Sequence, residues 1–485
     1  MSVDDDRKSP AAPAVTGTTW VGLMTVLVAE FMDLVDATTV TVALPSIAAD
    51  LGLSPAQVQW MLAGYTLAMG AGLITGGRLG DMLGRRRVFL AGLAAGTFFA
   101  ITAAVAPTAG WLLASRLLSG VSAAFTVPLV LGLVRASFTA EQRPKALGLY
   151  GATLGLASVV GPVLGGALVS GDLWGLGWRA VFWINVPIGI VALVIGWWVL
   201  PESRDPRPAR LDLVGALLVA VVATLVLLPL AQGAQLGGPG WTIIGLVAAT
   251  AVAFGLVTHL RRRIARGADP LFPPALFARR GFSAGVGVAL VFFGAIGSFF
   301  LVLVLYLQDG TGRSAWATGL VLLPYAVGSV ITSGLSVTLA ARMGRTLLIV
   351  GALVLALGQA LLLLFLAGPG EPGYPPLAAA LFVAGLGLGL AAPPLIDVVL
   401  SAVDDRHAGT AAGVLTTATQ IGGALGVAVL GSIYFASLRD AGPAAGVAGA
   451  HSAALSTALP WQIGAYLLAA GLMTRLPARA TTDPV

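Results

Sequence analysis

Residues 77–87 read GRLGDMLGRRR and separate two apolar runs at about 56–77 and 87–106. The loop holds four arginines and one aspartate, whereas the flanking runs carry almost no charge. A helix of roughly 20 apolar residues crosses the hydrocarbon core of a bilayer, which is about 30 Å thick. The stretch therefore predicts two membrane-spanning helices joined by a short charged loop.

Apolar runs of the same size recur along the whole chain, and we count fourteen. Of the 485 residues, 57% are hydrophobic and only 10% are charged, whereas about a quarter of the residues of a soluble domain are charged. Fourteen helices of about 22 residues each leave no room for a separate soluble domain. The predicted fold class is an all-α, polytopic membrane protein with 14 transmembrane helices.

The basic residues gather in alternate loops, as the Arg78–Arg87 loop illustrates. Loops rich in Arg and Lys stay in the cytoplasm, so both termini are predicted to be cytoplasmic. This distribution also accounts for the net charge of +6 without a nucleic-acid partner. We expect a multi-pass monomer in the lipid bilayer of the cytoplasmic membrane of a bacterium.

Several function classes lack the residues they need. The chain has no cysteine, and its three histidines lie far apart, at 259, 407 and 451, so no metal site is expected. Neither of its two lysines, at 8 and 145, belongs to a phosphate-binding loop. No nucleophile–base–orienter set stands out, and no cofactor is expected. A membrane-embedded enzyme is therefore the disfavoured alternative.

The chain repeats itself weakly. Residues 338–345 echo the loop at 78–85, and residues 406–409 echo the segment at 143–148. Both echoes lie about 260 residues downstream, which fits two six-helix bundles separated by a two-helix insert. The predicted parts are a cytoplasmic tail at 1–19, an N-terminal bundle at 20–200, a linker with two inserted helices at 201–281, a C-terminal bundle at 282–475 and a tail at 476–485.

Two motifs resemble those of the major facilitator superfamily. The loop resembles its cytoplasmic signature, which implies a conformational latch formed by Gly77, Asp81, Gly84, Arg85 and Arg86, with Glu141 and Arg143 as partners. The fifth predicted helix ends in a Gly-Pro-x-x-Gly-Gly pattern that is similar to the antiporter motif. Its motif positions are Gly155, Gly161, Pro162, Gly165 and Gly166.

The first predicted helix reads LVDATTVTVALP at residues 34–45. This is similar to the first-helix signature of drug:proton antiporters, with Thr41 at a position where asparagine is usual. The chain thus resembles the fourteen-helix drug:proton antiporter group of this superfamily. The resemblance implies that Asp36 takes part in proton coupling. It implies the same for Arg116 of the fourth helix, where Ser119 replaces the usual glutamine.

The charges inside the spans support this reading independently. Glu30, Asp33 and Asp36 occupy one face of the first helix, at about 100° per residue, at depths of about 15, 20 and 24 Å from Trp20. An ionised carboxylate inside a bilayer needs a charged partner, water or a proton. We expect these three acids to serve proton coupling, while the family pattern supplies only Asp36, so that Glu30 and Asp33 either take up protons, bind substrate or hold water. For Arg116 the alternative to coupling is a static ion pair with one of these acids.

The weaker candidates are polar or aromatic residues inside other spans, which either join helices by hydrogen bonds or line a substrate cavity. They are Tyr65, Asn185, Tyr325, Gln359, Asp397 and Gln420.

The predicted function is a proton-coupled antiporter that exports small amphipathic, cationic drugs or antibiotics by alternating access. Its partners are a small-molecule substrate and protons. The alternative is an exporter with the same fold that carries one metabolite, antibiotic or lipid.

Overall fold

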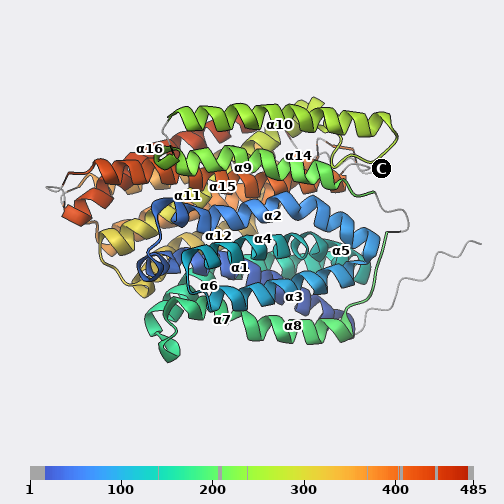
Figure 1. The fold of residues 1–485 in the computed structure, drawn as a ribbon, viewed down its shortest axis with the longest axis horizontal. Helices are drawn as coiled ribbons and strands as arrows, with labels where there is room; N and C mark the ends of the chain where they lie inside the picture. Colours follow the sequence, from blue (N-terminus) through green and yellow to red (C-terminus); the bar gives the residue numbers. More distant parts are fainter. Residues whose placement is uncertain are drawn as a thin grey trace, which may run out of the picture.

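The computed structural model describes residues 17–139, 141–205, 210–236, 239–368, 370–401, 403–404, 408–442 and 446–478. These residues form helices that run side by side along one direction (Figure 1). The part of the chain described contains no β-strand. The predicted all-α class is confirmed.

The helices of the first half lie at the predicted spans. They are α1 (Gly17–Leu51), α2 (Pro55–Leu83), α3 (Arg85–Ala104), α4 (Ala109–Ala124), α5 (Val127–Ser137), α6 (Arg143–Gly171), α7 (Ala180–Trp183) and α8 (Asn185–Val199), with short 3₁₀ turns η1 (Leu173–Gly175) and η2 (Gly177–Arg179). The loop predicted at 77–87 is wrong, because α2 continues to Leu83 and α3 begins at Arg85, so that only Gly84 lies between them. The span predicted at 109–136 is divided into α4 and α5 at Phe125 and Thr126.

The remaining helices form the insert and the second half. They are α9 (Leu213–Leu236), α10 (Pro239–Ala265), η3 (Pro274–Ala278), α11 (Arg280–Leu305), the π-helical turn η4 (Tyr306–Gly310), α12 (Ala315–Met343), α13 (Arg345–Leu366), α14 (Tyr374–Leu400), α15 (Ala408–Asp440) and α16 (Gly446–Met473). The sequence predicts the last span at about 461–475, whereas the helix begins at Gly446, and its first turns consist largely of small residues that add little hydropathy.

Twelve helical segments within the described residues are long and apolar enough to cross a membrane. The helices α2 and α16, with 29 and 28 residues, are not among these twelve. The outer surface is apolar, as membrane lipid requires: the side chains of Trp198 on α8 and Phe254 on α10 are 80% and 72% exposed. The chain is therefore a polytopic membrane protein, whereas the total of fourteen spans stays a prediction.

The insert lies along one edge of the molecule (Figure 1). Helix α9 packs against α10, and it also contacts α2 of the first half and α15 of the second. One such contact is a hydrogen bond of 2.8 Å from the Ser432 hydroxyl to the carbonyl of Leu230. The insert therefore lies beside the seam between the two halves.

The two halves also use the same kind of turn after their second helices. Gly84 (φ 111°) joins α2 to α3, and Gly344 (φ 52°) joins α12 to α13. Only glycine adopts these positive φ values readily. The residue after each glycine is an arginine whose backbone N–H donates a hydrogen bond to the chain beyond the last helix of its half: Arg85 to Ser203, and Arg345 to Ala478. The second echo, at 406–409, lies partly outside the described residues.

Candidate functional site

Helix α1 positions the three predicted acids, and each contacts a different neighbouring helix. The hydroxyl of Tyr150 on α6 donates to Oε1 of Glu30 at 3.3 Å. The hydroxyl of Tyr65 on α2 donates to Oδ1 of Asp33. Four neighbouring helices thus contact the acidic face of α1 when the partners of Asp36, described next, are included.

Asp36 forms an ion pair with Arg116 of α4, through Oδ2 and Nη1. Its other oxygen, Oδ1, accepts a hydrogen bond of 2.9 Å from the side-chain amide of Asn185 on α8. The Arg116 side chain is only 2% exposed and lies over the rings of Tyr65 and Phe182, at 4.5 and 5.8 Å from their centroids. The ion pair expected between the first and fourth helices is therefore present.

A central cavity of about 220 Å³ lies between the two halves. Its walls come from α1, α2, α4 and α6 on one side and from α11, α12, α14 and α15 on the other. Most lining side chains are apolar or hydroxylic. Of the predicted cavity residues, Tyr65 and Tyr325 line it, and so does Pro162 of the antiporter motif.

A second, smaller cavity of about 50 Å³ lies within the first half, and it is lined by Asp33, Asp36 and Asn185. Tyr65 and Arg116 line both cavities. Asp36 is not among the lining residues of the central cavity. The Tyr65 and Arg116 side chains therefore lie between the acids and the central cavity.

The other predicted cavity residues lie elsewhere. Gln359 is fully buried on α13, with neither amide atom hydrogen bonded within the described residues. Gln420 contacts the sulfur of Met69 at 3.5 Å, between α15 and α2. Asp397 is exposed on α14. None of the three lines either cavity.

The glycines of α6 allow close helix packing on both sides. A side chain at Gly161 would collide with Thr38 of α1, and one at Gly165 would lie 2.9 Å from the backbone of Thr39. A side chain at Gly166 would lie 2.5 Å from the carbonyl of Ala315 on α12, in the other half. Gly155 has only an ordinary contact, with Val330. The motif thus brings α6 close to both halves beside the cavity.

Further contacts join the halves at the end of the bundle away from residues 78–87. The side-chain amide of Gln308 in η4 donates to the carbonyl of Val42 on α1 at 2.8 Å. The backbone N–H of Trp316 on α12 donates to the hydroxyl of Ser170 on α6 at 2.9 Å. These bonds close the seam beyond the central cavity at that end.

The stretch 77–87 proposed as a latch, which forms the end of α2, the turn at Gly84 and the start of α3, makes several polar contacts. Asp81 and Arg85 form an ion pair of 2.8 Å, and Arg87 lies 3.4 Å from a carboxylate oxygen of Glu202. Arg86 donates to the carbonyl of Trp197 at the end of α8. This stretch therefore binds the chain segment that leads from the first half into the linker.

The other predicted latch residues flank this arrangement. A side chain at Gly77 would make an ordinary contact with Pro128 on α5, and Gly84 forms the turn described above. Arg143 donates to the carbonyl of Phe138 at 3.2 Å, next to Glu141 in the same connection.

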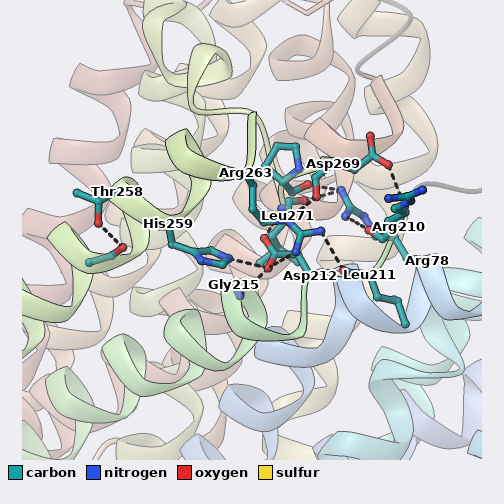
Figure 2. A network of polar contacts seen from close by, with 12 residues as sticks. Arg78, Arg210, Leu211, Asp212, Gly215, Thr258, His259, Arg263, Asp269 and Leu271 are labelled. Atoms are coloured by element: carbon teal, nitrogen blue, oxygen red, sulfur yellow. Dashed lines mark hydrogen bonds and ion pairs between the residues drawn. The ribbon is translucent and has the colours of Figure 1, made fainter. Parts of the chain in front are cut away.

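A polar network that was not predicted from the sequence anchors the insert near Arg78, at the end of the bundle where residues 77–87 lie (Figure 2). Asp212, at the start of α9, accepts hydrogen bonds from His259 of α10 at 2.8 Å and from the backbone N–H groups of Gly215 and Leu271 at 2.9 Å each. Arg263 lies 3.6 Å from the same carboxylate. This carboxylate caps α9 and ties α10 and the following chain to it.

Arg78 extends the network to the first half. Its guanidinium donates to the carbonyls of Arg210, Pro270 and Leu271, at 2.9, 2.6 and 3.0 Å. The first arginine of this stretch thus binds both ends of the insert to α2. The signal available in the sequence was an aspartate just before an apolar run, with a glycine three residues later.

The network gives a prediction about pH. Burial raises the pKa of Asp212, but the hydrogen bonds from His259, Gly215 and Leu271 and the charge of Arg263 outweigh burial, so the pKa lies below its ordinary value. A lowered carboxyl pKa gives stability that is present above the unfolded value and is lost only as pH falls through the folded value. Asp212→Asn should therefore destabilise the purified protein by about 1.5–3 kcal/mol at pH 8, and the deficit should still be present at pH 5, in thermal unfolding in detergent.

The matched control is Glu371→Gln, since Glu371 is exposed in the connection between α13 and α14. It should unfold like the wild type at both pH values. A deficit of Asp212→Asn that disappears at pH 5 would contradict the lowered pKa.

Within the described residues, no group of three His, Asp or Glu side chains is placed to hold a metal ion. The site consists instead of carboxylates, one guanidinium and hydroxyl groups around two cavities.

Several known proteins resemble this chain in sequence. The chain is 40% identical over 434 residues to a probable actinorhodin transporter of Streptomyces coelicolor, a match that covers 88% of this chain and 74% of that protein. It is 36% identical over 475 residues to the puromycin resistance protein pur8 of Streptomyces alboniger, covering 93% and 90%. It is 32% identical over 410 residues to the multidrug resistance protein Stp of Mycobacterium tuberculosis, covering 84% and 74%.

Among solved structures, the fold is similar to that of a peptide transporter, POT, crystallised with sulfate. The TM-score is 0.67, the sequence identity 16%, and 94% of each chain is covered. At this identity the likeness concerns the fold alone. The family model of the Major Facilitator Superfamily matches residues 26–427. This match covers most of the sequence, and the fold has two bundled halves around a central cavity. The chain therefore belongs to the major facilitator superfamily of membrane transporters.

Proposed function

We propose that the chain exports small amphipathic antibiotics or drugs across the bacterial cytoplasmic membrane, in exchange for protons. The observation that carries the proposal is the buried Asp36–Arg116 ion pair, whose arginine also lines the cavity between the two halves. Its relatives named for actinorhodin, puromycin and multiple drugs support an exporter of antibiotics.

The proposed coupling runs through Arg116. When Asp36 is ionised, it holds the guanidinium beside the smaller cavity. A proton on Asp36 removes that attraction, and the guanidinium then turns toward the central cavity, which it already borders. Its charge and volume there disfavour bound cargo. Proton and cargo thus exclude each other, which is the condition for exchange.

Asp33 and Glu30 serve as further proton sites in this proposal. Both lie on the same face of α1 and are hydrogen bonded by tyrosines, Tyr65 and Tyr150. Since Tyr65 also borders the central cavity, Asp33 is placed to sense whether cargo is present. Glu30 lies closer to the start of α1 and is placed to pass protons to or from that end.

The proposed topology has fourteen spans in a 6 + 2 + 6 layout with both termini in the cytoplasm. The similar turns at Gly84 and Gly344 support two related bundles. The contacts of Arg78 support an insert that moves with the first half. We propose that the stretch from Gly77 to Arg87, with Glu141 and Arg143, stabilises one of the two transport conformations.

A second candidate function is export of one compound only, supported by relatives named for single antibiotics.

Transport into everted membrane vesicles tests proton-coupled export and its breadth. Respiration acidifies the vesicle lumen, and lumenal pH is followed after adding ethidium, a permanent cation, or 6-acetyl-2-dimethylaminonaphthalene, a neutral aromatic ketone. Export coupled to protons predicts loss of lumenal acid on addition of at least one of them, in vesicles that contain the chain. Unchanged lumenal pH with both compounds and with puromycin would contradict a broad proton-driven exporter.

A further inference from the structure

A groove on the outer surface of the first half lies between α3 and α8, at the edge of the molecule opposite the insert (Figure 1). Its volume is about 850 Å³, which falls within the roughly 300–1,000 Å³ usual for sites that hold a small molecule. Among the described residues, those that line this groove line neither of the two cavities described above. The groove is therefore a separate feature of the lipid-facing surface.

The walls of the groove are apolar along most of its length. Ala91 and Ala94 of α3 are exposed and small, so they leave space beside the larger side chains of Leu193 and Val194 on α8. In a membrane-spanning chain, exposed apolar side chains of this kind face the hydrocarbon tails of the lipids. This part of the groove is therefore suited to an acyl chain.

One end of the groove is polar. Arg86 and Arg87 lie at the start of α3, and Glu202 follows the end of α8. Beside them, Trp197 and Trp198 are 64% and 80% exposed. Because exposed tryptophans gather where the hydrocarbon core meets water, this end of the groove lies at the depth of the lipid headgroups.

The two arginines retain the capacity to bind an anion. Arg86 lies 5.6 Å from the centroid of the Trp197 ring, and it uses one of its five N–H groups for the Trp197 carbonyl. Arg87 lies 3.4 Å from Glu202, and its side chain is 70% exposed. Two guanidinium groups against one carboxylate leave one positive charge. A single phosphodiester balances that charge, and guanidinium groups bind phosphate oxygens through charge-assisted hydrogen bonds.

We propose that this groove binds a phospholipid whose headgroup carries one negative charge, such as phosphatidylglycerol. Its phosphate contacts Arg86 and Arg87, and one of its acyl chains lies along Ala91 and Ala94. Basic pockets beside membrane-spanning helices are a recurring kind of site for anionic lipid headgroups. The inference rests on the membrane-spanning fold and not on the proposed export of drugs, so either can fail without the other.

Native mass spectrometry of the purified full chain in detergent tests the proposal. The protein is titrated with dioleoyl phosphatidylglycerol, or with dioleoyl phosphatidylcholine, which has the same acyl chains and no net charge. The peaks of free and lipid-bound protein give the dissociation constant of the first lipid. We expect phosphatidylglycerol to bind at least about tenfold more tightly, because its phosphate meets the arginines without bringing a cation beside them.

Arg86→Gln/Arg87→Gln removes both charges at the polar end. It should weaken binding of phosphatidylglycerol at least about tenfold, and bring it to the level of phosphatidylcholine. The matched control is Arg261→Gln/Arg262→Gln, an adjacent pair of exposed arginines near the end of α10 that does not line the groove. Its affinity for phosphatidylglycerol should stay within about twofold of the wild type, because charges beyond a Debye length are screened.

A second variant tests the apolar part and keeps both arginines. Ala91→Phe/Ala94→Phe places large side chains in the groove at two exposed positions, where the core needs no repacking. It should weaken binding of phosphatidylglycerol at least about fivefold, because the acyl chain loses the apolar surface that it covers. All variants are titrated after size-exclusion chromatography, so that only folded protein is compared.

Four results would overturn the proposal. The first is phosphatidylcholine that binds as tightly as phosphatidylglycerol. The second is an Arg86→Gln/Arg87→Gln variant that keeps the wild-type affinity, or a control pair on α10 that loses as much. The third is wild-type affinity in Ala91→Phe/Ala94→Phe, which would mean that the arginines hold the lipid without the groove. The fourth is a second copy of the chain, seen as a dimer that those two phenylalanines abolish, in place of a lipid.

Discussion

Asp36→Asn should abolish proton-coupled export while leaving a protein that folds and inserts. The substitution keeps the size of the side chain and an oxygen that can accept from Arg116 or Asn185, but it removes the group that takes up a proton. Arg116 also keeps its contacts with the rings of Tyr65 and Phe182. The variant is therefore expected in the membrane in near-normal amounts, with lower stability. Substrate-dependent loss of lumenal acid in everted vesicles should fall to the level of vesicles without the chain.

The matched control for this loss is Asp397→Asn. It makes the same chemical change in an acid of another membrane-spanning helix, exposed on α14 and outside both cavities. We expect it to transport like the wild type. Substrate-dependent proton movement at the wild-type rate in Asp36→Asn would show that another group carries the proton.

The second large effect concerns stability. Arg116→Gln leaves the buried Asp36 carboxylate without its cationic partner, which should cost about 3–5 kcal/mol. The double variant Asp36→Asn/Arg116→Gln contains neither charge, so we expect it to regain most of that stability. It should nevertheless remain without proton-coupled export, because both coupling groups are gone. Thermal unfolding in detergent and the vesicle assay measure the two properties separately.

The control pair for stability lies near the surface. Arg179 and Asp50 form an ion pair of 2.9 Å with side chains that are 32% and 49% exposed. Because exposed pairs contribute about 0–1 kcal/mol, Arg179→Gln should change stability far less than Arg116→Gln. A double variant at Asp36 and Arg116 that is no more stable than Arg116→Gln would show that the pair is not the cause of the loss.

The sequence predicted the helices and the charged centre of the site for a simple reason. Long apolar runs need no tertiary information to be recognised, and an acid or arginine inside such a run is rare enough to attract notice. Asp36, Asp33, Glu30 and Arg116 were therefore identified individually. The helical period alone put the three acids on one face, and the structure agrees, because their partners lie on helices that surround that face.

The partners themselves were harder to predict. Tyr150, which binds Glu30, is one of seven tyrosines. It lies 120 residues after Glu30, and nothing in the sequence indicates that these two side chains meet. Asn185 was noted as a polar residue within a span, but its bond to Asp36 depends on how α8 packs against α1. The division into two cavities likewise depends on the side chains of Tyr65 and Arg116, which only the folded structure places between them.

Helix ends also depend on tertiary contacts. Asp212 was not singled out within the predicted linker with two inserted helices, although it joins α9, α10 and the following chain through four neighbours. Gln359 and Gln420 were plausible cavity residues because they are polar within apolar runs, but helix rotation directs them into contacts between helices.

The most direct test of the account is proton flux through the purified protein. Proteoliposomes carry a pH dye in a lumen that is one unit more acidic than the outside, and potassium with valinomycin holds the membrane potential at zero. Adding the neutral ketone outside should accelerate loss of lumenal acid in the wild type but not in Asp36→Asn, and one pH unit can support about tenfold accumulation at one proton per molecule. Acid loss at the same rate with and without the ketone, or equal acceleration in Asp36→Asn, would contradict exchange of cargo for a proton at Asp36.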